Sequence, residues 1–456
     1  MAKQMTKQMT KNMTEGNPLR LILLFSLPMI AGNLLQQMYN MVDGIIVGRA
    51  LGAEALASVG ATSSVQFLII GFCTGTCSGF AIPLAQSFGA GDHRGLKRFV
   101  WNTWFLTAMM AVIITALCVI FCPTILHLLS TPDEIYQNAY SYLVILFIGI
   151  PCTLLYNMLA GMLRAVGDSR TPFLFLVFST CLNIVLDLLF IIVFGWGCAG
   201  AARATIMSQG VSGLLCLRLL LKRYDILKPG SEERKIQGNY VRKLLFTGIP
   251  MGLQYSVTAI GSMMMQIADN RLGTVFISGY ASGFKIKHLF MCPMDAMGTA
   301  TAMYVGQNLG ANRMDRIRKG MLQMTGTAAL YGIFCGIIMY FFGYSISSLF
   351  VSSDNVEVLA ASAMYAKYVG MFMWTVGILI VIRYSVQGMG YSAITVVGGG
   401  LELAARGMVS FLAVPVYGYL AVCFTDQVAW VVAMVYIIVI GIWCFRRVQR
   451  RMEKAL

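Results

Sequence analysis

The chain has 456 residues, of which 58% are hydrophobic and 12% are charged, and its formal net charge at pH 7 is +15. Soluble proteins carry about 25% charged residues, so this composition excludes an ordinary soluble domain and indicates a helical membrane protein. The basic excess does not indicate a nucleic-acid partner, because most basic residues lie between the apolar segments, where they orient membrane spans.

Apolar segments of the length that a spanning helix needs recur along the whole chain. The sequence predicts twelve spans, at residues 19–47, 57–87, 99–121, 136–161, 172–194, 200–221, 244–268, 278–308, 320–343, 356–383, 394–414 and 421–445. Residues 1–17 are predicted to form an N-terminal tail, residues 222–243 a linker and residues 446–456 a basic C-terminal tail. The basic residues gather in these three segments and in the loops on the same side, so we expect both termini to be cytoplasmic.

The two halves of the chain repeat each other. The phrase "AQSFGAGDHRG" at 85–95 matches "GQNLGANRMDR" at 306–316, which is an offset of 221 in the numbering. Pro28 pairs with Pro250 at an offset of 222, and Gly167 pairs with Gly390 at 223. We therefore expect an all-α polytopic fold of two six-helix lobes, an N-lobe at 18–221 and a C-lobe at 244–445. Six spans per lobe give both lobes the same orientation, related by a pseudo-twofold axis along the membrane normal, as in alternating-access transporters.

Ionisable residues inside predicted spans mark candidate ion pathways. Asp43 lies in the first span, within "YNMVDGIIVGRALG", and Asp187 lies in the fifth, one helical turn after Asn183. Ala201 and Thr205 have the same spacing in the sixth span. With a helical rise of about 1.5 Å per residue, these three spans place their polar groups at similar depths. Such oxygen ligands suit a hard cation such as Na+, and two close carboxylates can instead share a proton.

Other residues of these spans are predicted to act around this site. Gln36, Tyr39 and Asn40 share the helix face of Asp43 and are candidate substrate contacts. Pro28 removes one helix hydrogen bond and is a candidate hinge in the first span. In the eleventh span, Glu402 and Arg406 are spaced i,i+4 and are predicted to neutralise each other.

The order and spacing of these motifs resemble the MATE (multidrug and toxic compound extrusion) family over about residues 18–445. The resemblance rests on the proline of the first span, the pattern Asp-x-x-x-Val-Gly-x-x-Leu-Gly that closes it, Gln-x-x-Gly-Ala after spans 2 and 8, and Arg-Ala-x-Gly-Asp after span 4. It implies a V-shaped antiporter in a bacterial-type inner membrane that exchanges hydrophobic, often cationic drugs for H+ or Na+. It implies no cofactor besides the coupling ion, membrane lipids as neighbours, and a monomer.

The resemblance also implies roles for individual residues. Its DinF-like branch has a cation or proton site at positions that match Asp43, Asn183, Asp187, the Ala201 carbonyl and Thr205. Gln36, Tyr39 and Asn157 match positions of the family's substrate cavity. Another branch relies on a glutamate in span 7, where this chain has Gln254, which cannot titrate. This difference favours coupling in the N-lobe.

Two other functions fit the composition less well. A flippase for lipid-linked oligosaccharides, on a related fold, often has extra spans and a cavity lined by several cationic residues, whereas few cations fall within these twelve spans. A membrane-embedded enzyme needs a catalytic constellation within the spans. His93 and His127 fall in or beside loops and His288 has no evident partner, so no catalytic residue is predicted. We therefore expect a secondary transporter.

Overall fold

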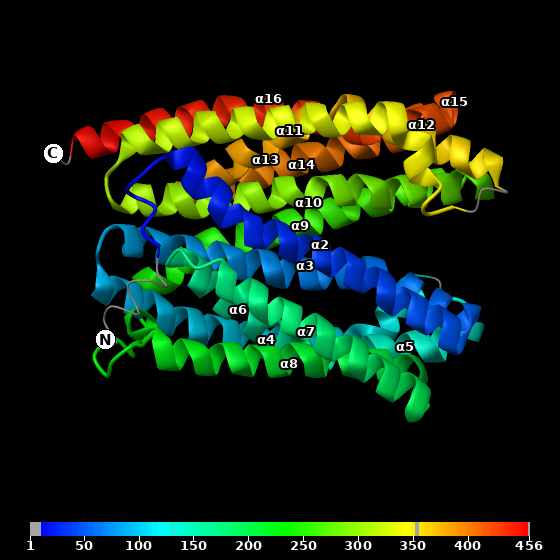
Figure 1. Cartoon of the computed structure of the whole chain (residues 1–456), viewed down its shortest axis with the longest axis horizontal. Helices are drawn as coiled ribbons and strands as arrows, with labels where there is room; N and C mark the ends of the chain where they lie inside the picture. The colour runs from blue at the N-terminus through cyan, green and yellow to red at the C-terminus, as the bar shows by residue number, and fades with distance from the viewer. Residues whose placement is uncertain (1–10, 130, 352–354, 455–456) are drawn as a thin grey trace. The chain divides into compact units, whose positions relative to one another are not determined.

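The computed structural model describes residues 11–129, 131–351 and 355–454, and the secondary structure within these ranges is entirely helical (Figure 1). The helices of the first half are α2 (Pro18–Leu51), α3 (Ala53–Gly89), α4 (His93–Leu128), α5 (Asp133–Ile148), α6 (Ile150–Ala165), α7 (Arg170–Asp187), η1 (Leu188–Val193), α8 (Gly197–Arg223) and η2 (Asp225–Leu227). Those of the second half are α9 (Gly238–Asp269), α10 (Thr274–Gly310), α11 (Met314–Ser347), α12 (Val356–Met371), α13 (Met373–Gly388), α14 (Ser392–Met408), η3 (Val409–Ala413), α15 (Val414–Tyr417) and α16 (Tyr419–Glu453). Helices satisfy their backbone hydrogen bonds internally, as a membrane interior requires.

Most of these helices are long and apolar enough to cross a membrane. Within the described ranges, eight helices meet this condition on their own, and the number becomes ten when each of the bent pairs α5–α6 and α12–α13 is taken as one span. α9 and α10, with 32 and 37 residues, are equally long but carry more polar side chains. Counted with these two, the helices correspond one to one with the twelve predicted spans. The prediction of an all-α polytopic fold is confirmed.

Two of the predicted spans are not continuous helices. α5 and α6 meet at Gly149 at an angle of 45°, and α12 and α13 meet at Phe372 at 53°. At the first break Pro151 lacks a backbone N–H, so the hydrogen-bond ladder of α5 cannot continue through it. At the second break the Phe372 N–H donates to the Val369 carbonyl (3.1 Å), which tightens the last turn of α12 and ends it.

The helix boundaries repeat with the offsets that the sequence motifs have. The bounds of α3 and α10 match at an offset of 221, and those of α5 and α6 match α12 and α13 at an offset of 223. Left-handed backbone conformations repeat as well, at Gly52 and Gly273 (φ 88° and 105°), Gly91 and Asn312 (69° and 56°), Gly167 and Gly390 (both 87°), and Gly197 and Gly418 (both 59°). The π-helical segments η1 and η3 also occupy matching places. The two halves therefore share a fold as well as motifs.

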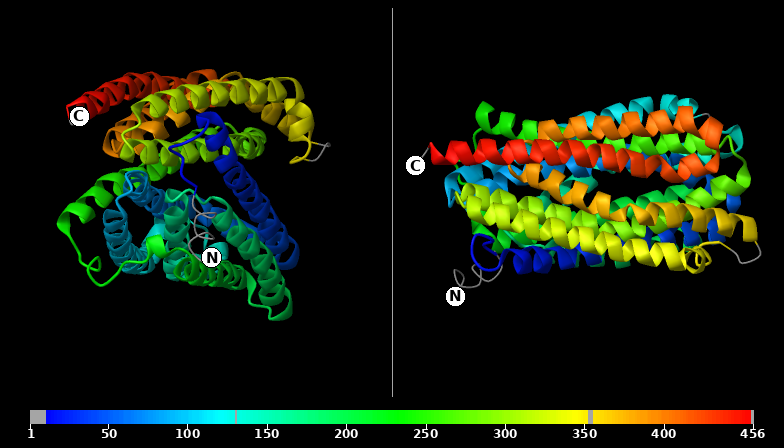
Figure 2. Two further views of the ribbon diagram at one scale, coloured as in Figure 1. Left: turned by 60° about the vertical axis from the view of Figure 1, so that its left-hand side comes forward. Right: turned by 90° about the horizontal axis from the view of Figure 1, so that it is seen from above.

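The chain packs as two compact units, which we call the first and the second unit. The first contains Ala31–Gly252, and the second contains Met13–Ile30 and Leu253–Leu456. In the first unit α3 packs against α5 and α6, and α7 packs against α8; in the second, α10 and α11 pack against α12 and α13, and α14 packs against α16 (Figure 2). The helices α2 and α9 each pass from one unit to the other two residues after a proline, Pro28 and Pro250.

Close helix packing in the second unit depends on glycine. A Cβ atom on Gly332 of α11 would lie 2.6 Å from the Cα atom of Trp374 and 2.7 Å from the Met373 carbonyl oxygen, at the start of α13. These are backbone atoms that cannot turn aside, so any larger residue would push the two helices apart. Small residues that allow such an approach are a common basis of helix packing in membranes.

Candidate functional site

Three helices of the first unit carry the residues predicted to couple ions. Asp43 lies in the last third of α2, Asp187 is the last residue of α7, and Thr205 lies in the third turn of α8. Asn183 and Ala201 each lie one turn before their neighbour, on α7 and α8, and so share its helix face. Regular helix geometry thus places these five residues on three helix faces. The contacts between their side chains depend on how the three helices pack.

Asp187 lies where α7 changes its hydrogen-bonding pattern. The π-helical segment η1 begins at the next residue, and at its end the Phe194 N–H reaches back five residues to the Leu189 carbonyl (3.0 Å). A π segment widens the helix locally and is often found at functional sites. Here it follows directly on a carboxyl side chain that is 0% exposed.

The carboxyl groups of Asp43 and Asp187 lie close enough to interact with each other. One oxygen of each, Oδ1, is buried and has no hydrogen-bond partner among the described residues. Over the same ranges neither carboxyl forms an ion pair with a lysine, arginine or histidine. Two negative charges so close and so poorly solvated repel each other, which a proton or a bound cation would relieve.

Hydrogen bonds connect this carboxyl pair to α8 and back to α2. With the Asn183 amide turned so that both of its ends are satisfied, its nitrogen donates to Asp187 Oδ2 (2.8 Å) and its oxygen accepts from the backbone N–H of Thr205 (3.1 Å). The Thr205 hydroxyl pairs with the hydroxyl of Tyr39 (3.0 Å). Because Tyr39 and Asp43 lie one turn apart on α2, the five side chains form a closed ring through three helices. We call Tyr39, Asp43, Asn183, Asp187 and Thr205 the carboxylate ring.

An apolar cluster packs beside the carboxylate ring. It includes Val47, one turn after Asp43, and Ala201, one turn before Thr205, and both are at most 1% exposed. The buried members of the cluster are Val47, Ala55, Tyr142, Leu146, Ile191, Cys198, Ala201 and Ala202. Apolar surroundings increase the cost of an uncompensated charge, so they strengthen the need of the two carboxyl groups for a cation or a proton.

Of the residues predicted to contact substrate, only Tyr39 joins the ring. Gln36 and Asn40 are exposed on α2 and, within the described ranges, have no hydrogen bond to the ring. Asn157 of α6 donates to the Thr153 carbonyl one turn earlier (2.9 Å). Pro28 lies inside α2, which continues through it.

Two neighbours of the site are absent from the sequence prediction. Tyr142 of α5 is 5% exposed and lies close enough to Asp43 and to Gln66 of α3 to interact with both. Gln66 in turn donates to the Thr62 hydroxyl (3.0 Å). A neutral tyrosine and a neutral glutamine in apolar segments do not by themselves indicate a functional site. The internal repeat does indicate one for Tyr142, because the position that matches it at the offset of 223 is also a tyrosine, Tyr365.

The chemistry of the ring suits a small hard cation or a proton. Carboxylate, amide and hydroxyl oxygens are the ligands that such cations prefer. Over the described residues, no group of three or more histidine, cysteine, aspartate or glutamate side chains is arranged to hold a metal ion. With two carboxyl groups and neutral oxygens, the ring has the chemistry to bind and release one proton or one monovalent cation.

Comparison with known proteins identifies the family. The MatE family model matches residues 28–189 and 250–401, the two repeated segments, each of which begins at the paired proline. The probable multidrug resistance protein YpnP of Bacillus subtilis is 32% identical over 82% of this chain and 84% of its own length. A second probable multidrug resistance protein of that organism, YoeA, is 29% identical over 74% of both chains.

Solved structures show the same fold. A crystal structure of MATE in complex with MaL6 superposes with a TM-score of 0.88 at 23% identity, covering 97% of this chain and 99% of that one. The fold is thus shared over nearly the whole length, and the family model covers more than half of the chain. The chain therefore belongs to the MatE family of multi-pass membrane transporters.

Proposed function

We propose that this protein is an antiporter that expels hydrophobic, often cationic compounds by alternating access, in exchange for H+ or Na+ bound at Asp43 and Asp187. The observation that carries the proposal is the pair of neighbouring carboxyl groups, each with a buried oxygen that lacks a hydrogen-bond partner, and neither with an ion-paired cation among the described residues. The names of the two Bacillus relatives support drugs or toxic compounds as the substrate class.

The carboxylate ring explains how ion binding would change the conformation. When the ion or proton is bound, the two carboxyl groups attract it and hold α2 against α7. When it leaves, the like charges repel, and the attachment of α2 through Tyr39 and Thr205 is weakened (their hydroxyls are 3.0 Å apart). A ligand can shift a conformational equilibrium only through such a difference in affinity between states. Asn183, Thr205 and the Ala201 carbonyl are the neutral ligands in this scheme.

We further propose that the chain belongs to the DinF-like branch of the family, in which coupling takes place in the first unit. The support comes from Gln254 of α9, at the position where another branch has a glutamate. Its side chain is 9% exposed, and its Oε1 accepts a hydrogen bond from Gln387 Nε2 (2.6 Å). A neutral amide held in this way cannot take up a proton or supply a negative charge.

Pro28 is the hinge of the proposed conformational change. α2 belongs to the second unit up to Ile30 and to the first unit from Ala31 onward, so the change falls two residues after the proline. Proline removes one hydrogen bond from the helix ladder and makes bending at that point easier. The segment that moves would carry Gln36, Tyr39 and Asn40, which we propose as substrate contacts together with Asn157 of α6.

The basic residues support a cytoplasmic location for both termini. Lys222 and Arg223 end α8, Arg450 and Arg451 lie in the last turn of α16, and the connection between α8 and α9 is also basic. Basic residues beside membrane spans stay on the cytoplasmic side. We propose a monomer in a bacterial-type inner membrane with both ends in the cytoplasm.

Exchange measured in proteoliposomes tests the coupling site. Asp43→Asn and Asp187→Asn should each abolish uptake of a fluorescent cationic drug driven by an imposed gradient. Gradients of pH and of Na+ applied separately identify the ion. Asp133→Asn, at the exposed start of α5, is the matched control and should leave exchange unchanged. Undiminished exchange in both ring variants would refute the proposal.

The hinge has its own test. Pro28→Ala restores the missing backbone N–H, so α2 should resist bending. We expect drug binding to persist while exchange slows, measured as separate binding and transport assays. A variant that exchanges at the rate of the unmodified protein would remove Pro28 from the mechanism.

A further inference from the structure

The second unit contains a buried charge network at the positions that correspond to the carboxylate ring and its neighbours. The offsets are those of the repeat, 221 for α3/α10 and α8/α16 and 223 for α5/α12, while α7 and α14 end at an offset of 221, directly before η1 and η3. The matched pairs are Gln66 and Lys287, Thr205 and Asp426, and Tyr142 and Tyr365, and the last residue of α7, Asp187, matches the last residue of α14, Met408. Two neutral residues of the first unit are thus replaced by charged ones, and the carboxyl group of Asp187 by a methionine thioether.

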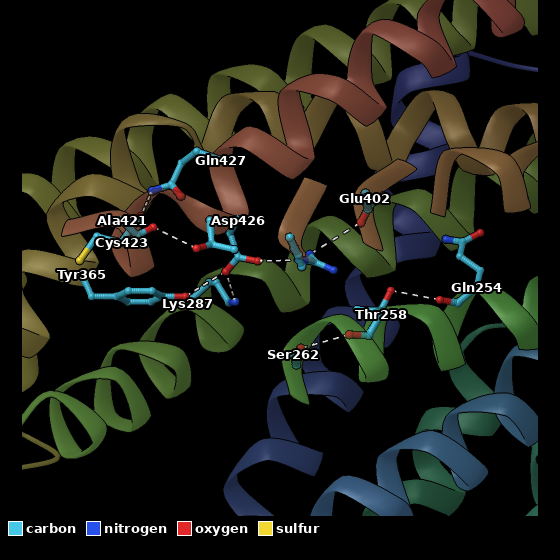
Figure 3. A network of polar contacts seen from close by, with 12 residues as sticks. Gln254, Thr258, Ser262, Lys287, Tyr365, Glu402, Ala421, Cys423, Asp426 and Gln427 are labelled. Carbon is cyan, nitrogen blue, oxygen red and sulfur yellow. Dashed lines mark hydrogen bonds and ion pairs between the residues drawn. The ribbon is translucent and has the colours of Figure 1, made fainter. Parts of the chain in front are cut away.

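Asp426 of α16 is the centre of the network (Figure 3). Its Oδ2 accepts hydrogen bonds from the Lys287 ammonium (2.6 Å) and the Tyr365 hydroxyl (2.9 Å), and its Oδ1 accepts from Arg406 Nε (3.1 Å). Asp426 is 2% exposed and Lys287 is 5% exposed. The carboxylate is therefore saturated with donors, whereas Asp43 and Asp187 each have an oxygen without one.

The Lys287 ammonium occupies a complete cation site. Besides the Asp426 carboxylate, it lies 4.3 Å from the centre of the Phe284 ring and 5.9 Å from that of Tyr365. A carboxylate together with aromatic faces is the set of groups that binds ammonium ions. Here the ammonium belongs to the protein itself, on the α10 side chain that matches Gln66.

The network continues beyond Asp426. Arg406 Nη2 lies 3.7 Å from Glu402 Oε2, and Glu402 forms an ion pair with Arg383 of α13. Lys287, Asp426, Arg406, Glu402 and Arg383 therefore alternate in sign. Gly261 of α9 gives Arg406 its room, because a Cβ atom there would lie 3.0 Å from both the Cδ and Nη1 atoms of the arginine. This glycine matches Tyr39 of the ring at the offset of 222.

From these contacts we propose that the second unit retains a copy of the cation site that is permanently occupied by the Lys287 ammonium, with Arg406 as a second internal cation. Cations are then exchanged at the carboxylate ring of the first unit alone, one site per transport cycle. The inference rests on the proposed function for its meaning in transport, while the occupied site itself rests on the geometry around Asp426. The ring's own carboxylates support it, since Asp187 corresponds to Met408, and Asp43 also to a methionine, Met264 or Met265, at an offset of 221 or 222.

Dicyclohexylcarbodiimide labelling of the full chain in lipid nanodiscs tests the proposal, because this reagent modifies protonated carboxyl groups in apolar surroundings. Peptide mass spectrometry should find label on Asp43 or Asp187 of the unmodified protein and none on Asp426. The double variant Lys287→Gln/Arg406→Asn removes both cations that bond to Asp426. It should produce labelling of Asp426 at about tenfold or more above the background of the unmodified protein, because the carboxylate loses both cations that keep it ionised.

Two controls keep this result specific. Lys287→Arg preserves the internal cation and should show the labelling of the unmodified protein. Lys285→Gln removes a lysine of the same helix that forms no ion pair within the described ranges, and it should also leave Asp426 unlabelled. Label on Asp426 in the unmodified protein, or none in a double variant that still elutes as a single folded species, would overturn the proposal.

A second test uses a variant that keeps Arg406. Lys287→Ala empties the cation site between Asp426, Phe284 and Tyr365. Methylammonium added to this variant should fill the site and recover most of the loss in melting temperature, and tetramethylammonium should not because it is too large. Failure of methylammonium to recover any stability would contradict an ammonium site. Retained exchange in Asp43→Asn and Asp187→Asn would refute the proposed function instead, and would leave these results on Asp426 unaffected.

Discussion

The carboxylate ring of the first unit and the charge network of the second unit occupy matching positions of a duplicated fold, yet they treat charge in opposite ways. In the ring, Asp43 and Asp187 face each other with two unsatisfied oxygens. In the network, Asp426 accepts bonds from a lysine, an arginine and a tyrosine. The difference suggests how two copies of one helix bundle can take different roles: one leaves its charge for an exchangeable ion, and the other compensates it internally.

The energetics of buried charges explain why this difference matters. An ion pair inside a membrane protein is tolerated because each charge has a partner, and removing one partner leaves the other charge buried and uncompensated. In the carboxylate ring, by contrast, the charges of Asp43 and Asp187 have no ion-pair partner among the described residues before any substitution is made. The same kind of substitution, an aspartate to an asparagine, should therefore destabilise the second unit and stabilise the first.

Asp426→Asn should have the largest effect on stability. It leaves Lys287 and Arg406 without their shared carboxylate, and breaking a buried pair in this way costs about 3–5 kcal/mol. Melting temperatures in detergent should fall accordingly, and cation-driven exchange per folded molecule should be retained. A variant as stable as the unmodified protein would show that the network is not compensated as the contacts indicate.

Arg406→Leu should cost less than Asp426→Asn. The substitution leaves two complete pairs, Lys287 with Asp426 and Arg383 with Glu402, so no charge remains without a partner. The loss is that of charged hydrogen bonds, about 1.5–3 kcal/mol. Melting of the two variants side by side gives the order. If Arg406→Leu lowered the melting temperature more than Asp426→Asn, the packing of the guanidinium against Gly261 would contribute more to stability than its charge.

Asp187→Asn should raise stability where the other two substitutions lower it. At alkaline pH without Na+, both ring carboxyl groups are charged, and removing one ends their repulsion and supplies an amide donor to Asp43, for a gain of about 1–2 kcal/mol. The gain should shrink at acid pH or in Na+, because a proton or cation then relieves the same repulsion. Melting temperatures across pH and Na+ concentration measure this, with Asp133→Asn as the control. Destabilisation at alkaline pH would mean that Asp187 has an internal counter-ion.

Much of this fold could be predicted from the sequence because apolar length and the internal repeat are strong signals. The helices match the predicted spans, and the paired prolines and glycines recur in the structure at their predicted offsets. The bends were not predicted. Pro151 offered a local signal for the break between α5 and α6, but no proline stands near Phe372 to mark the break between α12 and α13.

The carboxylate ring was predictable only in part. The i,i+4 spacing of Asn183 and Asp187 and the similar depths of Asp43 and Thr205 followed from helix geometry. The contact between Tyr39 and Thr205 did not, because it depends on the rotation of α2 relative to α8. The functional roles of these residues, and those of Gln36, Asn40 and Asn157, stay predictions.

The network of the second unit was largely missed. The pairing of Glu402 with Arg406 follows from their spacing, and the two are 3.7 Å apart. Arg383, however, is the last residue of the tenth predicted span, a position that does not indicate burial; it is 6% exposed within α13 and paired with Glu402. Asp426 was not recognised as a candidate, because the first turns of a span give no indication of depth. Extending the repeat to individual side chains, which aligns Asp426 with Thr205, would have found it.

Tyr39→Phe should have the smallest effect and isolates a ring contact that has no counterpart in the second unit, where Gly261 stands at the position matched by an offset of 222. The substitution keeps the aromatic ring and removes only the hydroxyl that pairs with Thr205 (3.0 Å), a neutral hydrogen bond worth about 0.5–1.5 kcal/mol. If this bond forms mainly when the ion is bound, the affinity of the ring for the coupling ion should fall about fivefold, since about 1 kcal/mol corresponds to that factor. Thr205→Val removes the partner hydroxyl, so the double variant should be no weaker than the worse of the two single variants. If the losses in ion affinity of the two single variants add in the double variant, Tyr39 acts on the substrate rather than on the ion. Asp43 would then be the only residue of α2 that takes part in ion binding at the ring.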